Sequence, residues 1–301
     1  MGPTAAGKTE LALQCVAEFP LEIISVDSAM IYRGMDIGTG KPPREVLQRV
    51  PHHLVDIRDP SEIYSAGQFV RDAQKSIADI QARGKIPLLV GGTMLYFRAL
   101  TEGLADLPEA NAEVRAQLNV EAADVGWAGM HAQLASVDPI AALRILPNDA
   151  QRIQRALEVY RLTGQTLSAL HAVAVRQSPS HRYLRLVWSP SDRAILYDRI
   201  AQRFQQMMTV GLLDEVSALY RRKDLSPELS AMRSVGYRQL LGHLAGKYDL
   251  NEAVNQGITA TRHLARRQLI WLRRMPDLIW HDSLELAAAD LIKQRLNRTL
   301  A

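Results

Sequence analysis

A glycine-rich run near the start of the chain has the residue types and spacing of a phosphate-binding P-loop. In such a loop, backbone N–H groups surround phosphate oxygens, and the following helix offers its positive N-terminal end. Lys8 would supply a point charge, and the hydroxyl of Thr9 would bind Mg²⁺. We therefore expect a phosphate-bearing ligand here. The run reads Gly2-Pro3-Thr4-Ala5-Ala6-Gly7-Lys8-Thr9 and matches G-x-x-x-x-G-K-[ST] in full.

The P-loop pattern by itself does not identify the phosphate ligand. Nucleotide kinases, ATPases and diphosphate transferases all use the same cradle. An ATPase usually adds an aspartate at the end of another strand to organise the metal. Here the apolar run Ile86–Val90 ends in Gly91-Gly92-Thr93, which holds no carboxylate. That ending disfavours an ATPase and leaves a kinase and a transferase open.

A carboxylate, Asp27, follows the apolar run Leu21–Val26 directly. In open α/β sheets, ligands bind beyond the carboxyl ends of the strands, so Asp27 occupies a position where a reacting group would lie. It could act as a general base or bind magnesium. It could equally cap a turn or a helix, a role that suits both Asp27 and Ser28. Position alone leaves both roles open.

The first third of the chain has the element order of a parallel sheet with crossover helices. Leu21–Val26 and Ile86–Val90 are β-rich runs, and apolar residues recur at helical spacing between Phe69 and Ile80. This order predicts an α/β fold, with a P-loop NTPase-like parallel sheet flanked by helices. A further strand is expected at Tyr183–Trp188. Since the sequence opens at Met1, a strand ahead of the P-loop is either truncated or outside the chain as given.

The middle of the chain lacks strand patterns and reads as a helical insertion. Ile153, Ala156, Leu157 and Tyr160 form an apolar stripe, and Gly164 would end that helix. We predict a P-loop core with C-terminal helices over 1–108 and 179–301, and a helical insertion domain over 109–178. Within the core, further helices are expected over 195–208, 212–220 and 251–274.

Composition excludes several protein classes. The chain has 301 residues and a net charge of +4, which is a modest excess, but arginine is concentrated between Arg182 and Arg274. Cys15 is the only cysteine, so an intrachain disulfide and a thiolate metal cluster are excluded, and a reducing compartment is expected. No signal peptide and no apolar run long enough to span a bilayer is evident. These features favour a cytoplasmic protein without a membrane partner.

Taken together, the motifs of this chain resemble those of the tRNA dimethylallyltransferases (isopentenyltransferases). The resemblance runs in the family order over nearly the whole chain. Because the chain ends without the zinc-finger tail of some eukaryotic relatives, we expect a bacterial member. The motifs after the P-loop are Asp27-Ser28-Ala29-Met30-Ile31-Tyr32, Pro51-His52-His53-Leu54-Val55-Asp56, Gly91-Gly92-Thr93-Met94-Leu95-Tyr96, Asn148-Asp149-Ala150-Gln151-Arg152-Ile153-Gln154-Arg155-Ala156-Leu157-Glu158, Arg233-Ser234-Val235-Gly236-Tyr237-Arg238 and Arg266-Arg267-Gln268-Leu269-Ile270-Trp271-Leu272-Arg273.

The resemblance implies a reaction and a set of partners. Dimethylallyl diphosphate would donate its prenyl group to the exocyclic N6 amine of the adenine 3′ to the anticodon, releasing diphosphate. The partners would be the anticodon stem-loop of tRNA and dimethylallyl diphosphate, with Mg²⁺ as the cofactor, and we expect a monomer. Asp27, Lys8 and Thr93 would be catalytic, and the whole P-loop would bind diphosphate. Thr93 could also cap the helix that follows it.

The resemblance also implies an RNA-binding surface. On the residues alone, Gln151, Arg152, Gln154 and Arg155 suit a solvated helix face; with the resemblance they suit RNA or a second contact to diphosphate. Arg262, Arg266 and Arg273 share one helical face by spacing, which suits a phosphate backbone. The predicted tRNA-binding residues are Asp27, Ser28, Ala29, Met30, Thr93, Arg115, Gln151, Arg152, Ile153, Gln154, Arg155, Arg233, Ser234, Val235, Gly236, Tyr237, Arg238, Arg266, Arg267, Gln268, Trp271 and Arg273.

Two other functions remain compatible with parts of the sequence. A P-loop nucleotide or small-molecule kinase would use the same cradle but would consume ATP. A non-catalytic RNA-binding protein could use the loop as a switch, although the Asp27 motif disfavours it. Transfer of a prenyl group without nucleotide consumption distinguishes the transferase from both.

Overall fold

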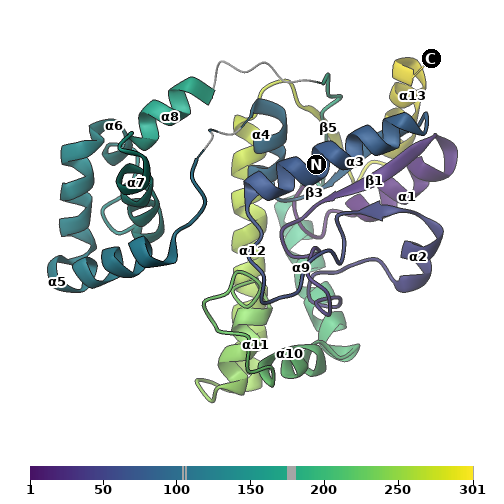
Figure 1. Ribbon diagram of the computed structural model, residues 1–301. Helices are drawn as coiled ribbons and strands as arrows, with labels where there is room; N and C mark the ends of the chain where they lie inside the picture. Colours follow the sequence, from purple (N-terminus) through teal and green to yellow (C-terminus); the bar gives the residue numbers. More distant parts are fainter. Residues whose placement is uncertain (104, 106, 175–180, 301) are drawn as a thin grey trace. The chain divides into compact units, whose positions relative to one another are not determined.

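The computed structural model describes residues 1–103, 105, 107–174 and 181–300, and it divides into two compact units. The first comprises Met1–Phe97 and Tyr183–Ala301, and the second comprises Arg98–Arg182 (Figure 1). The predicted border at 178 and 179 lies outside the described residues. Each unit is described by itself below.

The first unit is built on parallel strands. In a three-stranded sheet, β1 (Leu21–Val26) lies between β2 (His52–His53) and β3 (Ile86–Gly91). A second parallel pair joins β4 (Leu186–Ser189) to β5 (Ile279–Asp282). Parallel pairing requires crossover connections, and α3 (Ala66–Ala82) supplies the one between β2 and β3. The predicted α/β fold is therefore confirmed.

The residues that lead into the P-loop run between β3 and β4. The N–H of Trp188 donates to the carbonyl of Met1 at 2.9 Å. A Cβ at Gly2 would lie 2.1 Å from the carbonyl oxygen of Trp188, and a Cβ at Gly92 would lie 3.3 Å from the oxygen of Gly2. Glycine at position 2 is thus required by the close approach of β4, and the loop starts at the carboxyl ends of both strands.

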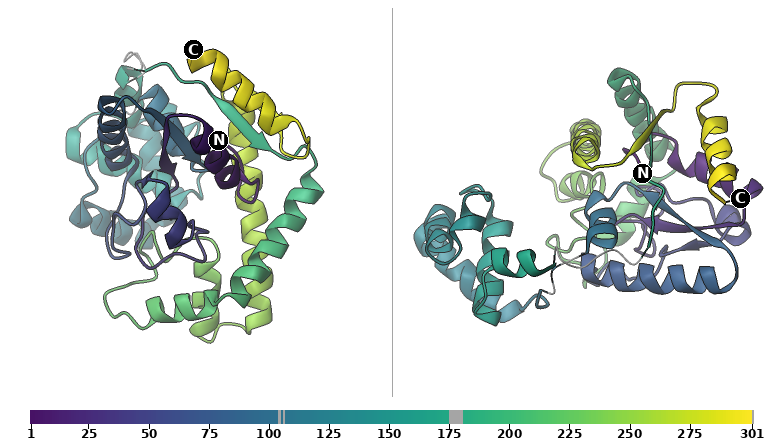
Figure 2. Two further views of the ribbon diagram at one scale, coloured as in Figure 1. Left: turned by 90° about the vertical axis from the view of Figure 1, so that its right-hand side faces the viewer. Right: turned by 90° about the horizontal axis from the view of Figure 1, so that it is seen from above.

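Helices pack on both faces of these strands (Figure 2). On one side, α3 begins at Ser65, which exchanges capping-box hydrogen bonds with Gln68. Its predicted apolar stripe is confirmed, since Phe69 and Ile80 have no exposed surface. On the other side, α1 (Lys8–Glu18) and α13 (Ala288–Leu300) form a core cluster that includes Cys15.

The remaining helices of this unit follow the predictions closely. The helix α12 (Leu250–Arg274) is capped by Asp249 and ends just before Pro276. The helices α9 (Arg193–Thr209) and α10 (Leu212–Tyr220) match their expected ranges within two residues. The strand expected at Tyr183 begins instead at Leu186. The other helices that begin in this unit are α2 (Arg44–Arg49), α4 (Met94–Glu102), which extends into the second unit, and α11 (Tyr237–Leu244).

The secondary-structure elements of the second unit, over its described residues, are all helices. It contains α5 (Ala112–Val137), α6 (Pro139–Ala142), α7 (Ala150–Thr163) and α8 (Leu167–Ala174). A kink at Gly126, whose φ is 71°, divides α5. As predicted, α7 ends at Gly164, which adopts the left-handed conformation. The core of the unit lies between α5, α6 and α7, with Leu118, Met130, Leu134 and Ile153 fully buried.

In the chain as described, none of the helices has both the length and the apolar character needed to cross a bilayer.

Candidate functional site

The P-loop backbone has the curled conformation of an anion-binding turn. Ala5 and Gly7 have φ values of 61° and 85°, and Gly7 is the N-cap of α1. Left-handed residues of this kind turn successive N–H groups toward one concave side. Within the described part of the chain, the N–H groups of Ala5, Ala6 and Gly7 find no protein acceptor. These donors are therefore available to a phosphate.

The side chain of Lys8 bonds back to this loop, and its pKa is altered. Its Nζ donates to the carbonyl of Pro3 at 2.6 Å. The pKa of Lys8 is lowered to about 8, mainly by burial; the negative charge of Asp27 opposes this shift and the positive charge of Arg203 adds to it. These groups share one electrostatic environment. An anion bound here would therefore favour the protonated form of Lys8.

Asp27 follows β1 and is half-buried beside the same groups. Its Oδ1 accepts hydrogen bonds from the N–H groups of Ala29, at 2.9 Å, and Met30, at 3.3 Å. The turn-capping role left open by the sequence is thus present. In the described residues, Oδ2 has no protein hydrogen bond, so one oxygen of the carboxylate remains for chemistry.

Thr93 links the ends of β1 and β3. Its Oγ1 accepts a hydrogen bond from the N–H of Ser28 at 3.1 Å and lies 3.4 Å from the Ser28 hydroxyl. Its own N–H donates to the carbonyl of Val26 at 3.1 Å. The N–H of Tyr96 bonds to the carbonyl of Thr93 and not to its hydroxyl, so the predicted side-chain cap of α4 does not form. The hydroxyl instead fixes the turn that carries Asp27.

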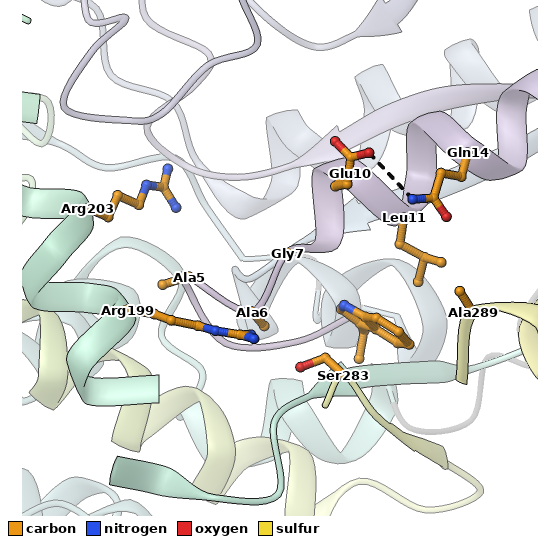
Figure 3. Close-up of a pocket in the computed structure, with 11 residues that line it drawn as sticks. Ala5, Ala6, Gly7, Glu10, Leu11, Gln14, Arg199, Arg203, Ser283 and Ala289 are labelled. Atoms are coloured by element: carbon orange, nitrogen blue, oxygen red, sulfur yellow. Dashed lines mark hydrogen bonds between the residues drawn. The ribbon is translucent and has the colours of Figure 1, made fainter. Parts of the chain in front are cut away.

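A pocket of about 510 Å³ opens beside the P-loop (Figure 3). Arg199 and Arg203 reach it from α9, and the indole of Trp188 closes another side. The guanidinium of Arg203 packs on the loop at Gly40, where a Cβ would lie 1.6 Å from it. Burial lowers the pKa of Arg203, although Asp27 opposes the shift. The pocket is lined by Ala5, Ala6, Gly7, Glu10, Leu11, Gln14, Trp188, Arg199, Arg203, Ser283 and Ala289.

Neither arginine of α9 was assigned to the site from the sequence. Arg199 and Arg203 are four residues apart, which places both on one helical face. That spacing alone also fits an ordinary solvated face, and no motif contains them. The fold supplies the missing information, because it brings α9 against the loop that contains Gly40.

The loop before Lys41 is held by a single carboxylate of α10. Glu215 accepts hydrogen bonds from the N–H groups of Asp36 and Ile37 at 2.8 Å and of Gly38 at 3.1 Å. The hydroxyl of Tyr237 also donates to it, at 2.5 Å. Tyr237 has no exposed surface, so its side chain is part of the packing that supports this loop. We assign it to the core and not to RNA contact.

The other RNA-contact candidates of the first unit differ in exposure. The arginines at 233, 238, 266, 267 and 273 are exposed, as an RNA-binding role requires. Trp271 is half-buried. The side chain of Gln268 is enclosed instead, and its amide bonds to Thr4 and Gly92. Ser28 is exposed, Ala29, Met30, Ser234 and Val235 are half-buried, and Gly236 is buried.

In the second unit, a buried carboxylate organises the candidate arginines. Glu158 has no exposed surface and accepts hydrogen bonds from Arg115 at 2.9 and 3.1 Å and from Arg155 at 2.7 Å. The N–H of Asn111 donates to it at 2.8 Å. Burial alone would raise the pKa of Glu158, but these donors hold it below its usual value. The guanidinium groups of Arg115 and Arg155 therefore have fixed orientations.

The rest of the α7 motif divides between surface and core. Gln151 and Arg152 are exposed, and Gln154 donates to the side chain of Asn119 at 2.7 Å. Ile153 is fully buried among the core residues of the unit. We therefore assign Ile153 to packing, because its side chain reaches no surface.

A magnesium ion fits the donors at the P-loop. Among the described residues, no group of three or more His, Cys, Asp or Glu side chains could hold a metal. Mg²⁺ usually takes one or two protein oxygens and completes its shell with substrate phosphates and water. The hydroxyl of Thr9 is a donor of this hard type. The site therefore suits an ion that arrives with a diphosphate.

Comparison with known proteins identifies the family. The family model described as IPP transferase matches residues 30–275. A tRNA dimethylallyltransferase of Methylobacillus flagellatus is 58% identical over 286 residues, or 95% of this chain and 91% of that protein. Another, of Paraburkholderia phymatum, is 52% identical over 304 residues, covering 100% and 96% of the two chains.

Solved structures agree with this result. A full-length tRNA isopentenylpyrophosphate transferase of Bacillus halodurans has a TM-score of 0.71 and 34% identity, covering 99% of this chain and 95% of that one. A eukaryotic dimethylallyltransferase, captured acting on tRNA, has a TM-score of 0.81 and 29% identity, covering 98% and 76%. The chain therefore belongs to the IPP transferase family.

Proposed function

We propose that this enzyme transfers a dimethylallyl group from dimethylallyl diphosphate to the N6 amine of the adenine 3′ to the anticodon in tRNA. The observation that carries the proposal is a carboxylate, Asp27, with one free oxygen beside a P-loop in which the N–H groups of Ala5, Ala6 and Gly7 have no acceptor among the described residues. Family membership supports a prenyl donor over a nucleotide. The same site explains why a base and an anion cradle occur together.

The P-loop would stabilise the leaving group. As the bond between the prenyl carbon and oxygen breaks, its electron pair goes to the diphosphate, which gains negative charge. The amides of Ala5–Gly7, the Nζ of Lys8 and the guanidinium of Arg203 are the positive groups of this environment. Stabilisation that increases as the bond breaks accelerates the reaction. Bound Mg²⁺, held by Thr9, would offset further charge on the diphosphate.

Asp27 would act on the nucleophile. The lone pair of an adenine N6 amine is delocalised into the ring, so the amine is a weak nucleophile. As its nitrogen bonds to the prenyl carbon, the amine must lose a proton, and the free oxygen of Asp27 would accept it. Thr93 would hold the Asp27 turn in place through its bond to Ser28. The adenine must leave its stack to reach this position.

The exposed arginines would bind the tRNA. Arg266, Arg267 and Arg273 on α12, together with Arg233 and Arg238, offer guanidinium groups suited to phosphate and to unstacked bases. In the second unit, Arg115, Gln151, Arg152 and Arg155 would contact the anticodon stem-loop. We place the enzyme in the cytoplasm as a monomer, where it would meet its RNA substrate.

A direct test separates this function from a kinase. The protein is incubated with dimethylallyl diphosphate, magnesium and unmodified tRNA, and the nucleosides are analysed by mass spectrometry. We expect a prenylated adenosine and release of diphosphate without any added nucleotide. Consumption of ATP with transfer of its terminal phosphate, and no prenylated nucleoside, would support the kinase instead.

A further inference from the structure

The buried amide of Gln268 connects two loops of the site that are far apart in sequence. This residue lies on α12 and is 8% exposed. Its Oε1 accepts a hydrogen bond from the N–H of Thr4 at 2.8 Å. Its Nε2 donates to the carbonyl of Gly92 at 2.8 Å. One side chain thus spans from the P-loop to the turn that precedes Thr93.

The two partners require a neutral amide. One partner is an N–H donor and the other is a carbonyl acceptor, so the side chain must both accept and donate. An ionised carboxylate of the same length could accept from Thr4 but would face the Gly92 oxygen without a proton. An apolar side chain would leave both buried backbone groups unpaired. The space is also tight, because a Cβ at Gly92 would lie 2.4 Å from Nε2.

The bond to Thr4 defines which amides can receive diphosphate. Because its N–H is taken by Gln268, Thr4 contributes no backbone donor to the anion. The free amides begin at Ala5, where the backbone turns into the left-handed conformation. Gln268 therefore fixes the position of Thr4, the residue that immediately precedes the free amides. Through Gly92 it also holds the segment that positions Thr93.

We infer that Gln268 is a positioning residue that sets the P-loop and the Thr93 turn at a fixed separation. This inference rests on the proposed function for its effect on turnover, but not for its effect on anion binding. The charged residues on the elements that it joins are Lys8 in the P-loop and, in α12, its neighbours Arg266 and Arg267 together with Glu252, Arg262, Arg273 and Arg274. Gln268 thus also fastens the P-loop to the helix proposed to bind tRNA.

The test uses a substitution that can be reversed by protonation. In Gln268→Glu, the introduced carboxyl can donate to Gly92 only when it is protonated. At about pH 8.5 we expect kcat/KM for prenyl transfer to fall about 30-fold relative to wild type. At about pH 6 we expect the ratio to recover to within about threefold, because burial favours the protonated acid. Affinity for magnesium pyrophosphate should follow the same course.

Two further variants define the controls. Gln268→Met, which is similar in volume but cannot form either bond, should remain impaired at every pH. Gln256→Glu makes the same chemical change on the same helix, at a residue whose side chain, among the described residues, bonds to Glu252 and to no part of the site, and it should follow wild type throughout. Thermal unfolding of each variant establishes that it is folded under the assay conditions.

The outcomes separate the inference from the proposed function. A Gln268→Glu variant whose pyrophosphate affinity is like wild type, or equally reduced at all pH values, would overturn the inference. Folded Gln268→Met with normal affinity would overturn it as well, even if Gln268→Glu failed to fold. If wild type transferred no prenyl group, the proposed function would fail, while the pyrophosphate measurements would still decide the role of Gln268.

Discussion

At the scale of single residues, the proposed stabilisation of diphosphate depends on charged groups that the fold holds together without a ligand. The pKa values of Lys8 and Arg203 are both lowered by loss of solvation, Asp27 opposes both shifts, and the two cations are half-buried. An enzyme that stabilises a departing diphosphate gains by keeping its positive groups poorly solvated before the anion binds. The altered pKa of Lys8 is the measurable sign of this arrangement.

The first prediction concerns the pH dependence of anion binding. In the free protein the pKa of Lys8 is lowered to about 8, so Lys8 loses its proton as the pH rises through that value. A bound anion favours the protonated form, so binding takes up a proton above about pH 8, and affinity falls up to about tenfold per pH unit. Calorimetry of pyrophosphate binding in buffers of different ionisation enthalpy measures both effects.

The control for this prediction is Lys8→Met, which keeps the side-chain length and removes the titrating group. Its binding should be weak and should show only the titration of pyrophosphate itself. Equal proton uptake by both proteins would contradict the assignment of the effect to Lys8.

The second prediction concerns Arg203, which the sequence did not reveal. Arg203→Ala should weaken pyrophosphate binding by about 1.5–3 kcal/mol, or roughly 10- to 100-fold, because a charged hydrogen-bond donor is lost. It should also move the midpoint of the pH dependence upward, since the charge of Arg203 lowers the pKa of Lys8. Arg193→Ala removes an exposed arginine from the same helix and should leave affinity and midpoint unchanged. An unchanged midpoint in Arg203→Ala would contradict the proposed proximity.

At the scale of elements, the second unit depends on how Glu158 joins α7 to the start of α5. This carboxylate is fully buried and receives Arg115, Arg155 and the Asn111 amide. Removing one partner from a buried charge cluster leaves the others uncompensated, at a cost of about 3–5 kcal/mol. The two guanidinium groups would also lose the orientation in which we propose that they meet RNA.

The third prediction follows from this arrangement. Glu158→Ala should lower the free energy of unfolding of the second unit by about 3–5 kcal/mol and weaken tRNA binding. Glu121→Ala is a matched control, because Glu121 also joins α5 to α7 through two bonds to Arg161, but its side chain is 38% exposed. Its cost should be at most about 1 kcal/mol. Urea unfolding of both variants makes the comparison, and equal costs would contradict the role of Glu158.

Elements with strong periodicity could be predicted from the sequence, and short or non-local features could not. The buried stripe of α3 and the strand Leu21–Val26 follow from hydrophobic spacing. The strands β2 and β5 are two and four residues long, too short for a pattern. Within the site, the P-loop was evident because its chemistry is contiguous. The place of Arg203 in the site and the bonds made by Gln268 could be found only from the fold, because their partners lie far away in sequence.

At the scale of the whole molecule, the chain combines an α/β unit with a helical unit inserted into it. The P-loop, Asp27 and the pocket arginines all belong to the first unit. The helical unit contains the Arg115 and α7 groups that we propose bind RNA. This division predicts that diphosphate binding involves the first unit alone, whereas tRNA would contact residues of both units.

The fourth prediction tests that division by hydrogen exchange. Magnesium pyrophosphate should protect the amides of the P-loop and of the turn after β1, because a ligand stabilises the segments that it binds. Exchange in α5 and α7 should remain unchanged. Lys8→Met should show little protection anywhere at the same ligand concentration. Equal protection in α5 and α7 would contradict independent diphosphate binding by the first unit.

The central claim is that Asp27 accepts the proton of the amine while the P-loop holds the departing diphosphate. The most direct measurement is the single-turnover rate of prenyl transfer by Asp27→Asn, together with its affinity for tRNA. Asparagine can still accept the bonds from Ala29 and Met30 but is no base, so the turn should persist. We predict a rate about 10²–10⁴-fold below wild type with tRNA affinity unchanged. A near-normal rate in Asp27→Asn and a large loss only in Asp27→Ala would show that Asp27 caps the turn and takes no proton.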